Sequence, residues 1–423
     1  MCICRRASRH PSGESPPPCT TGSPLVGERL VSRVGIACRG LDGQGAVANV
    51  ALRQARELAR RFRVLLMPER GVELALPGCE VQPVRSLDLG WLRRFAHAPR
   101  EYAFASAAAR EAWRWARRGE LGALLCHAHS VAALAARPRG TTPRIPCALV
   151  THGDIFDRPR GTYDARLTAL YRWVTPRAYR GASLVVALSP HMARLAIARG
   201  AEPGRVRVIP NGIAAEEFGL EAAEWQPVSL DGPLRILYVG RLAIEKGVDL
   251  LIDACRRLAN GGHPFCLEIV GTGPDERALR ERVAEGGISD RVRFVGTVPR
   301  QSLAARYLAC QVVSIPSRSD TLPTVALEAG RAGRAVVASA VGGLPFLVAD
   351  GETGCLVPGE DPAALADALA ALIRDREPLA AWGRAAWERT PRLFDWEVVG
   401  ESLAQALGEL CGVVGWEEGS HGA

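Results

Sequence analysis

The chain has 423 residues, of which 48% are hydrophobic and 23% charged, with twelve cysteines and a formal net charge of +8. This length suits two or three domains with full cores, and no apolar run reaches the roughly 18 residues that predict a membrane span. The cysteines form no CxxC pair and no His/Cys cluster, which argues against a zinc module and favours buried thiols in a reducing compartment. We therefore expect a cytoplasmic protein.

The charge is divided unevenly along the chain. Residues 1–220 carry 33 basic and 17 acidic side chains, whereas residues 221–423 carry 20 and 28. A basic first half predicts an anionic membrane surface or a charged acceptor as a partner, and a peripheral membrane association would follow. Solubility charge and unspecific attraction to nucleic acid are the alternatives, and we predict no nucleic-acid partner.

Residues 1–30 are rich in Pro, Ser, Cys and Arg without periodicity, so we expect a disordered extension outside the fold. From residue 31 onward, short β-rich runs alternate with helical patterns. Arg and aromatic residues interleave over 91–119, which indicates an interfacial helix or, as we prefer, a helix packed on a sheet by Phe104, Trp113 and Trp115.

The order of the runs predicts an α/β fold with two doubly wound parallel sheets. The first domain is expected over 31–215 and the second over 234–392, with a linker at 216–233. A terminal helix at 393–411 would cross back to the first domain, followed by a flexible tail at 412–423. Twelve β-rich runs support this organisation: VGIAC, FRVLLM, GALLC, CALVTH, SLVVALS and RVRVIP, then LRILYVG, FCLEIVG, RVRFVG, QVVSIPS, AVVAS and CLVP.

Ligands of open parallel sheets bind outside the carboxyl ends of the strands. The segments that follow the predicted strands are therefore the first candidates, and two such sheet ends facing each other predict a cleft between domains. These segments are GLDGQGA (40–46), CHAHS (126–130), THGD (151–154), IPNG (209–212), GRLAIEKG (240–247), VGTGP (270–274), FVGTVP (294–299) and SRSDTLPTVALEAG (317–330).

Lys246 is the one lysine among 53 basic residues. A lysine is a compact charge on a flexible stem, so its retention in an arginine-rich chain indicates a chemical requirement. It precedes a predicted helix N-terminus, and Arg241 closes the preceding strand. Two cations and a helix end predict a phosphate site, although a stray surface lysine is the alternative.

The glycine loop at 40–46 predicts backbone N–H groups of Gly43, Gln44 and Gly45 close to a donor phosphate or an acceptor. The loop also fits G-x-G-x-x-A, a weak dinucleotide signal, because residues 39–42 separate it from its strand. An NAD-dependent dehydrogenase would need this loop for the dinucleotide, and the second half gives no reason for one.

GRLAIEKG, together with Asp320 followed by Glu328 and Ala329, resembles the retaining, nucleotide-sugar-dependent glycosyltransferases of family 4, which have the GT-B fold. The resemblance covers residues 33 to about 410. It implies that Arg241 and Lys246 bind the donor diphosphate and stabilise the leaving group, and that Glu328 binds the ribose hydroxyls. Asp320 stands where Glu is usual, and the resemblance implies a catalytic role for it.

A helix is predicted to begin near Pro323, where the family usually has glycine. The free N–H groups of Thr324 and Val325 would then face the donor phosphates. The alternatives are a solvated helix glutamate for Glu328 and a capping aspartate for Asp320.

His152 resembles the family histidine that hydrogen-bonds the transferred sugar, and a satisfied buried histidine is the alternative. His129 is a weaker candidate, and Asp154 is a candidate ligand of the acceptor hydroxyl. The VGTGP and FVGTVP loops resemble those that enclose the nucleotide base. Gly271 and Gly273 would allow close approach, and Val298 would offer backbone groups.

The chain has no DxD motif and no ligand set of metal spacing, so we predict no metal and no organic cofactor. The predicted reaction is retaining transfer of a sugar from a UDP-sugar or GDP-sugar to a glycan, a lipid-linked or a small-molecule acceptor. A nucleotide-sugar epimerase of the same fold is one alternative. A non-catalytic relative is the other, prompted by Asp320 and Pro323.

Overall fold

The computed structural model describes residues 33–39, 41, 45–85, 97–135, 145–153, 165–220 and 225–412. The extension predicted to be disordered, 1–30, lies outside the described residues, as does the predicted tail from 413 onward. No helix in the described part of the chain has the length and apolar character needed to span a bilayer.

The first sheet has seven parallel strands in the order β3-β2-β1-β4-β5-β6-β7. Its central strands are apolar and buried, as strands covered on both faces must be. The order in which successive strands are added reverses between β1 and β4, which is the switch point of a doubly wound sheet. The strands are β1 (Arg33–Ala37), β2 (Arg63–Met67), β3 (Cys79–Val81), β4 (Ala123–Cys126), β5 (Cys147–Thr151), β6 (Leu184–Ala187) and β7 (Val206–Val208).

Helices cover both faces of this sheet. The helices α2 (His97–Arg117), α3 (His129–Ala135), α4 (Ala165–Gly181) and α5 (Pro190–Ala198) contribute to one hydrophobic cluster, and α1 (Ala46–Leu58) contributes to another. Phe104 and Trp113 are buried in the first cluster and Trp115 packs against it. These three aromatic residues of α2 therefore pack against the core of the domain, as we preferred.

The second sheet has six parallel strands in the order β10-β9-β8-β11-β12-β13, which repeats the topology of the first. Its switch point lies between β8 and β11. Together the two sheets confirm the predicted α/β class and its two doubly wound parallel sheets. The strands are β8 (Leu234–Val239), β9 (Phe265–Val270), β10 (Val292–Gly296), β11 (Val312–Ile315), β12 (Ala335–Ser339) and β13 (Gly354–Val357).

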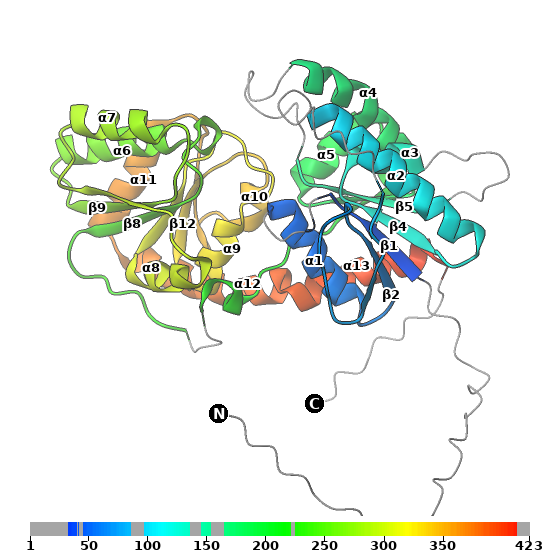
Figure 1. Ribbon diagram of the computed structural model, residues 1–423. Coiled ribbons are helices and arrows are strands. Elements are labelled where there is room, and N and C mark those ends of the chain that lie inside the picture. Colours follow the sequence, from blue (N-terminus) through cyan, green and yellow to red (C-terminus); the bar gives the residue numbers. More distant parts are fainter. Residues whose placement is uncertain are drawn as a thin grey trace, which may run out of the picture. The chain divides into compact units, whose positions relative to one another are not determined.

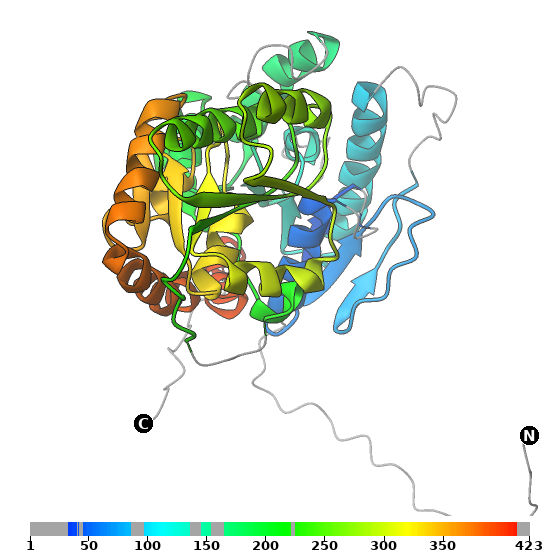
Figure 2. The same cartoon turned by 90° about the vertical axis from the view of Figure 1, so that its left-hand side faces the viewer.

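The helices of the second sheet also form two layers, which Figure 1 and the turned view of Figure 2 show. One layer has α6 (Val248–Asn260), α7 (Glu276–Glu285) and α11 (Pro362–Arg374), which share a cluster with β8 and β9. The other has α8 (Leu303–Ala309), α9 (Thr324–Arg331), α10 (Leu344–Leu347) and α12 (Glu377–Phe394).

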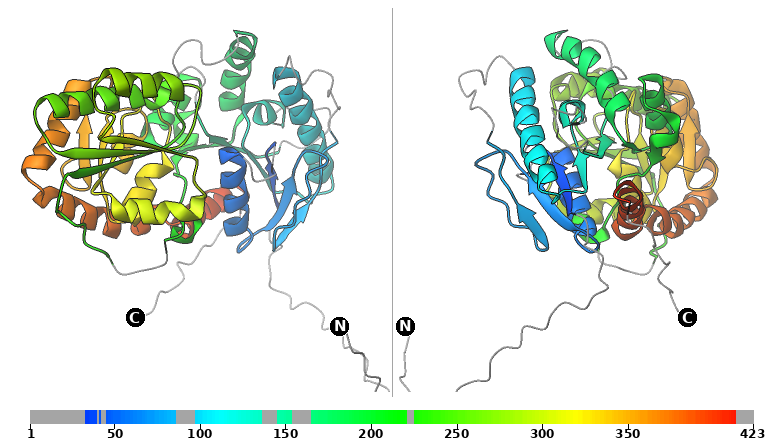
Figure 3. Two further views of the ribbon diagram at one scale, coloured as in Figure 1. Left: turned by 60° about the vertical axis from the view of Figure 1, so that its left-hand side comes forward. Right: turned by 90° about the vertical axis from the view of Figure 1, so that its right-hand side faces the viewer.

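The last helix, α13 (Trp396–Leu410), lies against α1 of the first sheet, and Figures 1 and 3 show the two helices side by side. Asp395 separates it from α12 and caps it by accepting a hydrogen bond from the Glu397 amide at 3.0 Å. The two helices touch closely at Gly400, where a Cβ would stand 2.5 Å from the Glu57 Cβ. The chain thus returns to its first half through a helix that has no room for a side chain at this point.

Candidate functional site

The turn after β8 carries two of the predicted site residues to the switch point of the second sheet. Lys246 ends a single 3-10 turn, and Gly247 follows in the left-handed conformation with φ 66°. A Cβ on Gly247 would stand 2.0 Å from the Pro316 carbonyl oxygen, so only glycine lets this turn lie against the end of β11. Lys246 is therefore held beside the segment that follows β11.

Lys246 and Asp320 form an ion pair. The Lys246 Nζ lies 2.6 Å from Asp320 Oδ2, and the Ser317 hydroxyl donates to the same oxygen at 3.3 Å. Both charged side chains are largely shielded, at 28% and 11% exposure. The two predicted residues, 74 positions apart, are thus brought into contact at the carboxyl ends of β8 and β11.

Arg241, the second predicted cation, pairs with Glu245. The Arg241 side chain remains 55% exposed, while Glu245 is buried and its carbonyl accepts from the Arg318 amide at 2.9 Å. Each predicted cation therefore already faces a carboxylate. An incoming diphosphate would share the two cations with these carboxylates or would displace the carboxylates, because it carries the same sign of charge and binds at the same place.

The N-terminus of α9 points at the same region. Pro323 is the N-cap residue, and no side chain caps the helix. The first helical residue is Thr324. The sequence predicted Pro323 in that position, so the helix begins one residue later than predicted. Val325 packs partly buried against the core. The first N–H groups of α9 are thus available to an anion.

Glu328 is buried one turn inside α9, at 2% exposure. It accepts a hydrogen bond from the Tyr307 hydroxyl at 2.6 Å and pairs with Arg300 at 3.1 Å. Burial raises the pKa of Glu328, while the Tyr307 hydrogen bond and the Arg300 charge oppose that rise. Arg300 also approaches Glu217 at 3.4 Å, and Glu217 pairs with Arg53 of α1. A chain of charges therefore links Glu328 to the first half.

The first half contributes histidines from the ends of β4 and β5. His152 follows β5, and its Nε2 lies 2.8 Å from Nδ1 of His127. Burial lowers the pKa of His152 to about 4, with a smaller contribution from His129. His129 makes a 3.3 Å contact between its Nε2 and the Tyr179 hydroxyl, and burial also lowers its pKa to about 4. These side chains are neutral at pH 7.

A cavity of about 670 Å³ is lined by five of the predicted site residues. It brings together Arg241, Lys246, Asp320, Thr324 and His152. Its remaining lining comes from α1, from the segments after β6, β7, β8, β10 and β11 and from the start of α13, and comprises Ala46, Val47, Asn49, Val50, Leu52, Arg53, Arg56, Leu188, Asn211, Gly212, Glu217, Glu245, Arg300, Ser319, Thr321, Leu322, Pro323 and Trp396.

Other predicted residues do not line this cavity. Val325 and Val298 pack against the core, and the Glu328 side chain pairs with the lining residue Arg300. Gly45 precedes α1 in an extended conformation, next to the lining residue Ala46. Gly43, Gln44 and Asp154 lie outside the described residues.

Gly271 and Gly273 are close to protein backbone. A Cβ on Gly271 would stand 1.9 Å from the Gly240 carbonyl oxygen, and one on Gly273 would stand 2.1 Å from that of Leu242. Glycine is therefore required here to let the turns after β8 and β9 meet. A role for either glycine beside the nucleotide base stays a prediction.

Asn211, Arg53 and Arg300 line the cavity but were not singled out in the sequence. Asn211 is buried at 7% exposure, and its Oδ1 has no hydrogen-bond partner among the described residues. The IPNG segment after a strand was the available signal for it. Arg53 and Arg300 gave no local signal, because their partner Glu217 lies 164 and 83 positions away.

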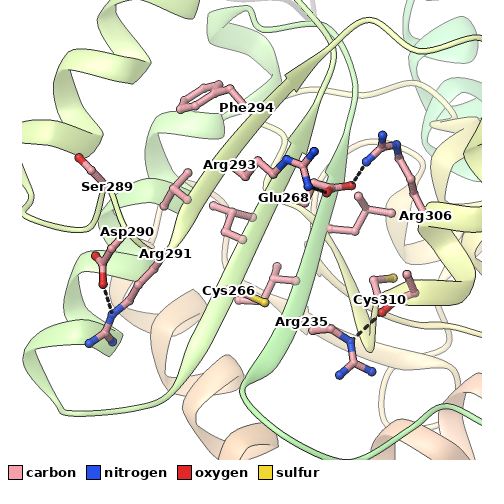
Figure 4. Close-up of a pocket in the computed structure, with 15 residues that line it drawn as sticks. Arg235, Cys266, Glu268, Ser289, Asp290, Arg291, Arg293, Phe294, Arg306 and Cys310 are labelled. Atoms are coloured by element: carbon pink, nitrogen blue, oxygen red, sulfur yellow. Dashed lines mark hydrogen bonds and ion pairs between the residues drawn. The ribbon is translucent and has the colours of Figure 1, made fainter.

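A second cavity, of about 590 Å³, lies on the second sheet and is shown in Figure 4. It is lined by the first halves of β8, β9 and β10, which is the end of a parallel sheet opposite to that where ligands bind. Four of its charged side chains are paired within the wall, Arg306 with Glu268 and Arg291 with Asp290 at 3.8 Å. The 670 Å³ cavity is therefore the better candidate site.

Two family models match this chain, one over each half. The family model "Glycosyl transferases group 1" matches residues 221–389, and the model "Glycosyltransferase Family 4" matches residues 47–217. A D-inositol 3-phosphate glycosyltransferase of Kribbella flavida is 36% identical over 220 residues, which are 49% of this chain and 51% of that protein. The chain thus spans about half the length of the curated relatives it matches.

Solved structures share the whole fold. Sucrose-phosphate synthase of Thermosynechococcus elongatus has a TM-score of 0.72 at 22% identity, covering 90% of this chain and 100% of that one. HepE of Anabaena in complex with UDP-glucose has a TM-score of 0.65 at 20% identity, covering 89% and 99%. These likenesses show the GT-B fold. With one family model on each sheet and this fold throughout, the chain belongs to the group 1 glycosyltransferases of family 4.

Proposed function

We propose that this chain transfers a sugar from a UDP-sugar or GDP-sugar to an acceptor hydroxyl with retention of configuration, using no metal and no organic cofactor. The contact of Lys246 with Asp320 at 2.6 Å, on the cavity that Arg241 and the α9 N-terminus share, carries this proposal. A nucleotide-sugar complex of the structural relative HepE supports the choice of donor class.

In the proposed reaction the bond between the anomeric carbon and the diphosphate oxygen breaks. Arg241, Lys246 and the N–H groups of α9 stabilise the charge that collects on the leaving oxygen, which is the term that prepositioned donors supply. The acceptor oxygen bonds to the same face of the sugar, and its proton passes to the departing phosphate. Asp320 faces the positive charge that develops on the sugar.

Calorimetric binding of UDP, GDP, ADP and NAD to the wild type and to Lys246→Ala tests the donor site. We expect one nucleoside diphosphate to bind selectively and to bind about tenfold more weakly to Lys246→Ala, since a charged hydrogen bond is worth about 1.5 kcal/mol or more. The matched control is Arg277→Ala, because Arg277 is 92% exposed and does not line the cavity. Binding of NAD, or binding indifferent to Lys246, would contradict the proposal.

Product analysis then separates transfer from its alternatives. With acceptor present, nuclear magnetic resonance of the product reports whether the anomeric configuration is retained. Turnover of the nucleotide sugar without any acceptor would indicate an epimerase instead. Nucleotide binding with no transfer to any acceptor would indicate a non-catalytic relative.

The acceptor that we propose is a glycan, a lipid-linked sugar or a small molecule, and we propose peripheral attraction of the basic first half to anionic membrane. The excess of 33 basic over 17 acidic side chains in residues 1–220 supports it. Sedimentation with anionic vesicles should show binding that falls with salt, because a screened surface attraction weakens at high ionic strength. Equal binding to neutral and anionic vesicles, or no binding to anionic vesicles, would contradict the proposed attraction to membrane.

A further inference from the structure

His127 is a buried histidine for which the proposed reaction has no role. It follows β4 and is 7% exposed, and its backbone amide donates to the Ala37 carbonyl at 3.1 Å, at the end of β1. Its ring stacks on that of His152, with centroids 5.0 Å apart and planes 23° apart. The two rings are therefore held as a pair by neighbouring strands β4 and β5.

The contact between the rings engages one defined nitrogen of each. His127 Nδ1 lies 2.8 Å from His152 Nε2, so Nδ1 is the nitrogen of His152 that is left for a ligand. His152 lines the 670 Å³ cavity, and its Nδ1 has no partner among the residues that the structure describes. His129 cannot replace His127 in this contact, because its Nε2 is engaged by Tyr179.

The 2.8 Å contact can hold only one hydrogen. Both rings are neutral, since burial lowers the pKa of each, and a neutral imidazole has one N–H and one acceptor nitrogen. Either His127 Nδ1–H donates to His152, or His152 Nε2–H donates to His127. The two choices leave opposite chemistry at His152 Nδ1, a donor in the first case and an acceptor in the second.

The other nitrogen of His127 decides between these choices. His127 Nε2 is buried and has no hydrogen-bond partner among the described residues. If His152 donated, this nitrogen would carry an unpaired buried N–H. Among buried backbone groups that lack a hydrogen-bond partner, N–H groups are rarer than carbonyl groups. We apply the same preference to the ring, so an unpaired acceptor nitrogen is favoured over an unpaired N–H. His127 Nε2 is therefore the bare acceptor, and Nδ1–H is the donor.

We propose that His127 is a positioning residue whose Nδ1–H donates to His152 Nε2 and thereby fixes the tautomer in which His152 offers Nδ1–H to an oxygen of the ligand. The arrangement selects an acceptor oxygen, such as a sugar hydroxyl, at that place in the cavity. The identity of the ligand rests on the proposed function, whereas the tautomer does not.

The tautomer is measured directly from the ring ¹⁵N shifts of His152 in the full chain, assigned by loss of its signals in His152→Gln. We expect a protonated Nδ1 in the wild type and in His127→Asn, whose amide nitrogen keeps a donor near the Nδ1 position. We expect a mixture of tautomers in His127→Leu, which fills the space without a donor. A protonated Nε2 in the wild type, or an unchanged spectrum in His127→Leu, would overturn the proposal.

Kinetics show whether the fixed tautomer serves the reaction. With UDP-glucose or the donor found by calorimetry, we expect His127→Leu to lose about fivefold to tenfold in kcat/KM, the worth of one net hydrogen bond, and His127→Asn to recover most of it. UDP affinity should stay unchanged in both variants, which excludes general unfolding. Loss of activity that His127→Asn does not recover would overturn the positioning role. If the wild type transfers no sugar, the proposed function fails and the ¹⁵N result still stands.

Discussion

The ion pair between Lys246 and Asp320 joins two charges that have separate roles in the proposed reaction. Lys246 stabilises the diphosphate, and Asp320 faces the positive charge that develops on the sugar. With Nζ and Oδ2 only 2.6 Å apart, the carboxylate neutralises the ammonium before a donor arrives. The same carboxylate must then remain close to a diphosphate that repels it. The free protein therefore gives up some nucleotide affinity to keep Asp320 where the sugar would lie.

Asp320→Asn should separate these effects. We expect UDP to bind up to about fivefold more tightly, since a partly exposed ion pair is worth up to about 1 kcal/mol. Transfer should fall about a hundredfold or more, because a charge aimed at the transition state is lost. Calorimetry measures the UDP affinity and a product assay measures the transfer. Asp253→Asn is the matched control, because Asp253 is paired with Arg282. Weaker UDP binding would show that Asp320 helps to bind the nucleotide.

Tyr307 supports a buried carboxylate that the nucleotide is expected to use. Its hydroxyl donates to Glu328 at 2.6 Å and lowers the pKa that burial raises. Tyr307→Phe should lower the free energy of unfolding by about 1 to 3 kcal/mol, the cost of leaving a buried acceptor short of a partner. UDP affinity should fall as well, because the Glu328 carboxylate loses the hydrogen bond that orients it and that opposes the rise of its pKa.

Urea unfolding and calorimetry check this, with Tyr102→Phe as the control, since Tyr102 is 46% exposed. The same substitution in a Glu328→Gln background should cost clearly less. An equal cost in both backgrounds would mean that Tyr307 acts through packing alone.

At the scale of elements, local pattern predicted nearly all of the strands. Each of the twelve β-rich runs overlaps a strand, because runs of apolar residues are typical of parallel sheets. The strand β3 was missed: its three residues, Cys79–Val81, include an exposed glutamate and form the sheet edge. A short edge strand is determined by its neighbour, and its own sequence gives little sign of it.

The candidate site was predicted only as far as local spacing reaches. Arg241, Lys246 and Asp320 follow apolar strands, and parallel topology then brings strand ends together. His127 acts through His152, which is 25 positions away. Arg300 and Tyr307 both contact Glu328, which is 28 and 21 positions away. Such pairings leave no periodic pattern, so only the structure identifies them.

The contact between α1 and α13 depends on Gly400. Gly400→Ala would place a Cβ about where the Glu57 Cβ and Cγ lie, at 2.5 and 2.8 Å. We expect a loss of about 1 to 3 kcal/mol in the free energy of unfolding, as for overpacking of a tight contact, despite the better helix propensity of alanine. Gly204→Ala is the control, because nothing lies within 4 Å of the added Cβ. Equal urea midpoints for the two variants would contradict the prediction.

At the scale of the whole molecule, the buried histidines make folding depend on pH. His129 and His152 have pKa values of about 4 in the folded chain, and that of His127 is also lowered. Unfolding restores the ordinary value near 6.5, so between these values the unfolded chain binds more protons. The stability that these groups contribute is present above about pH 6.5 and is lost as the pH falls toward 4.

Glu57 and Glu328 act in the opposite sense, because burial raises their pKa values in the folded chain and their contribution is lost as the pH rises above about 4.5. A comparison of the wild type with a histidine variant cancels the contributions of these two glutamates, because both chains contain them. His129→Asn should remove about one proton from the uptake on unfolding near pH 5 and leave the uptake at pH 7.5 unchanged. Urea unfolding of both chains from pH 4.5 to 7.5 gives this uptake as the slope of free energy against pH. Parallel slopes would contradict this prediction, because a His129 that is already charged in the folded chain takes up no proton on unfolding, and a charged His129 would remove the basis for a neutral histidine cluster beside the cavity.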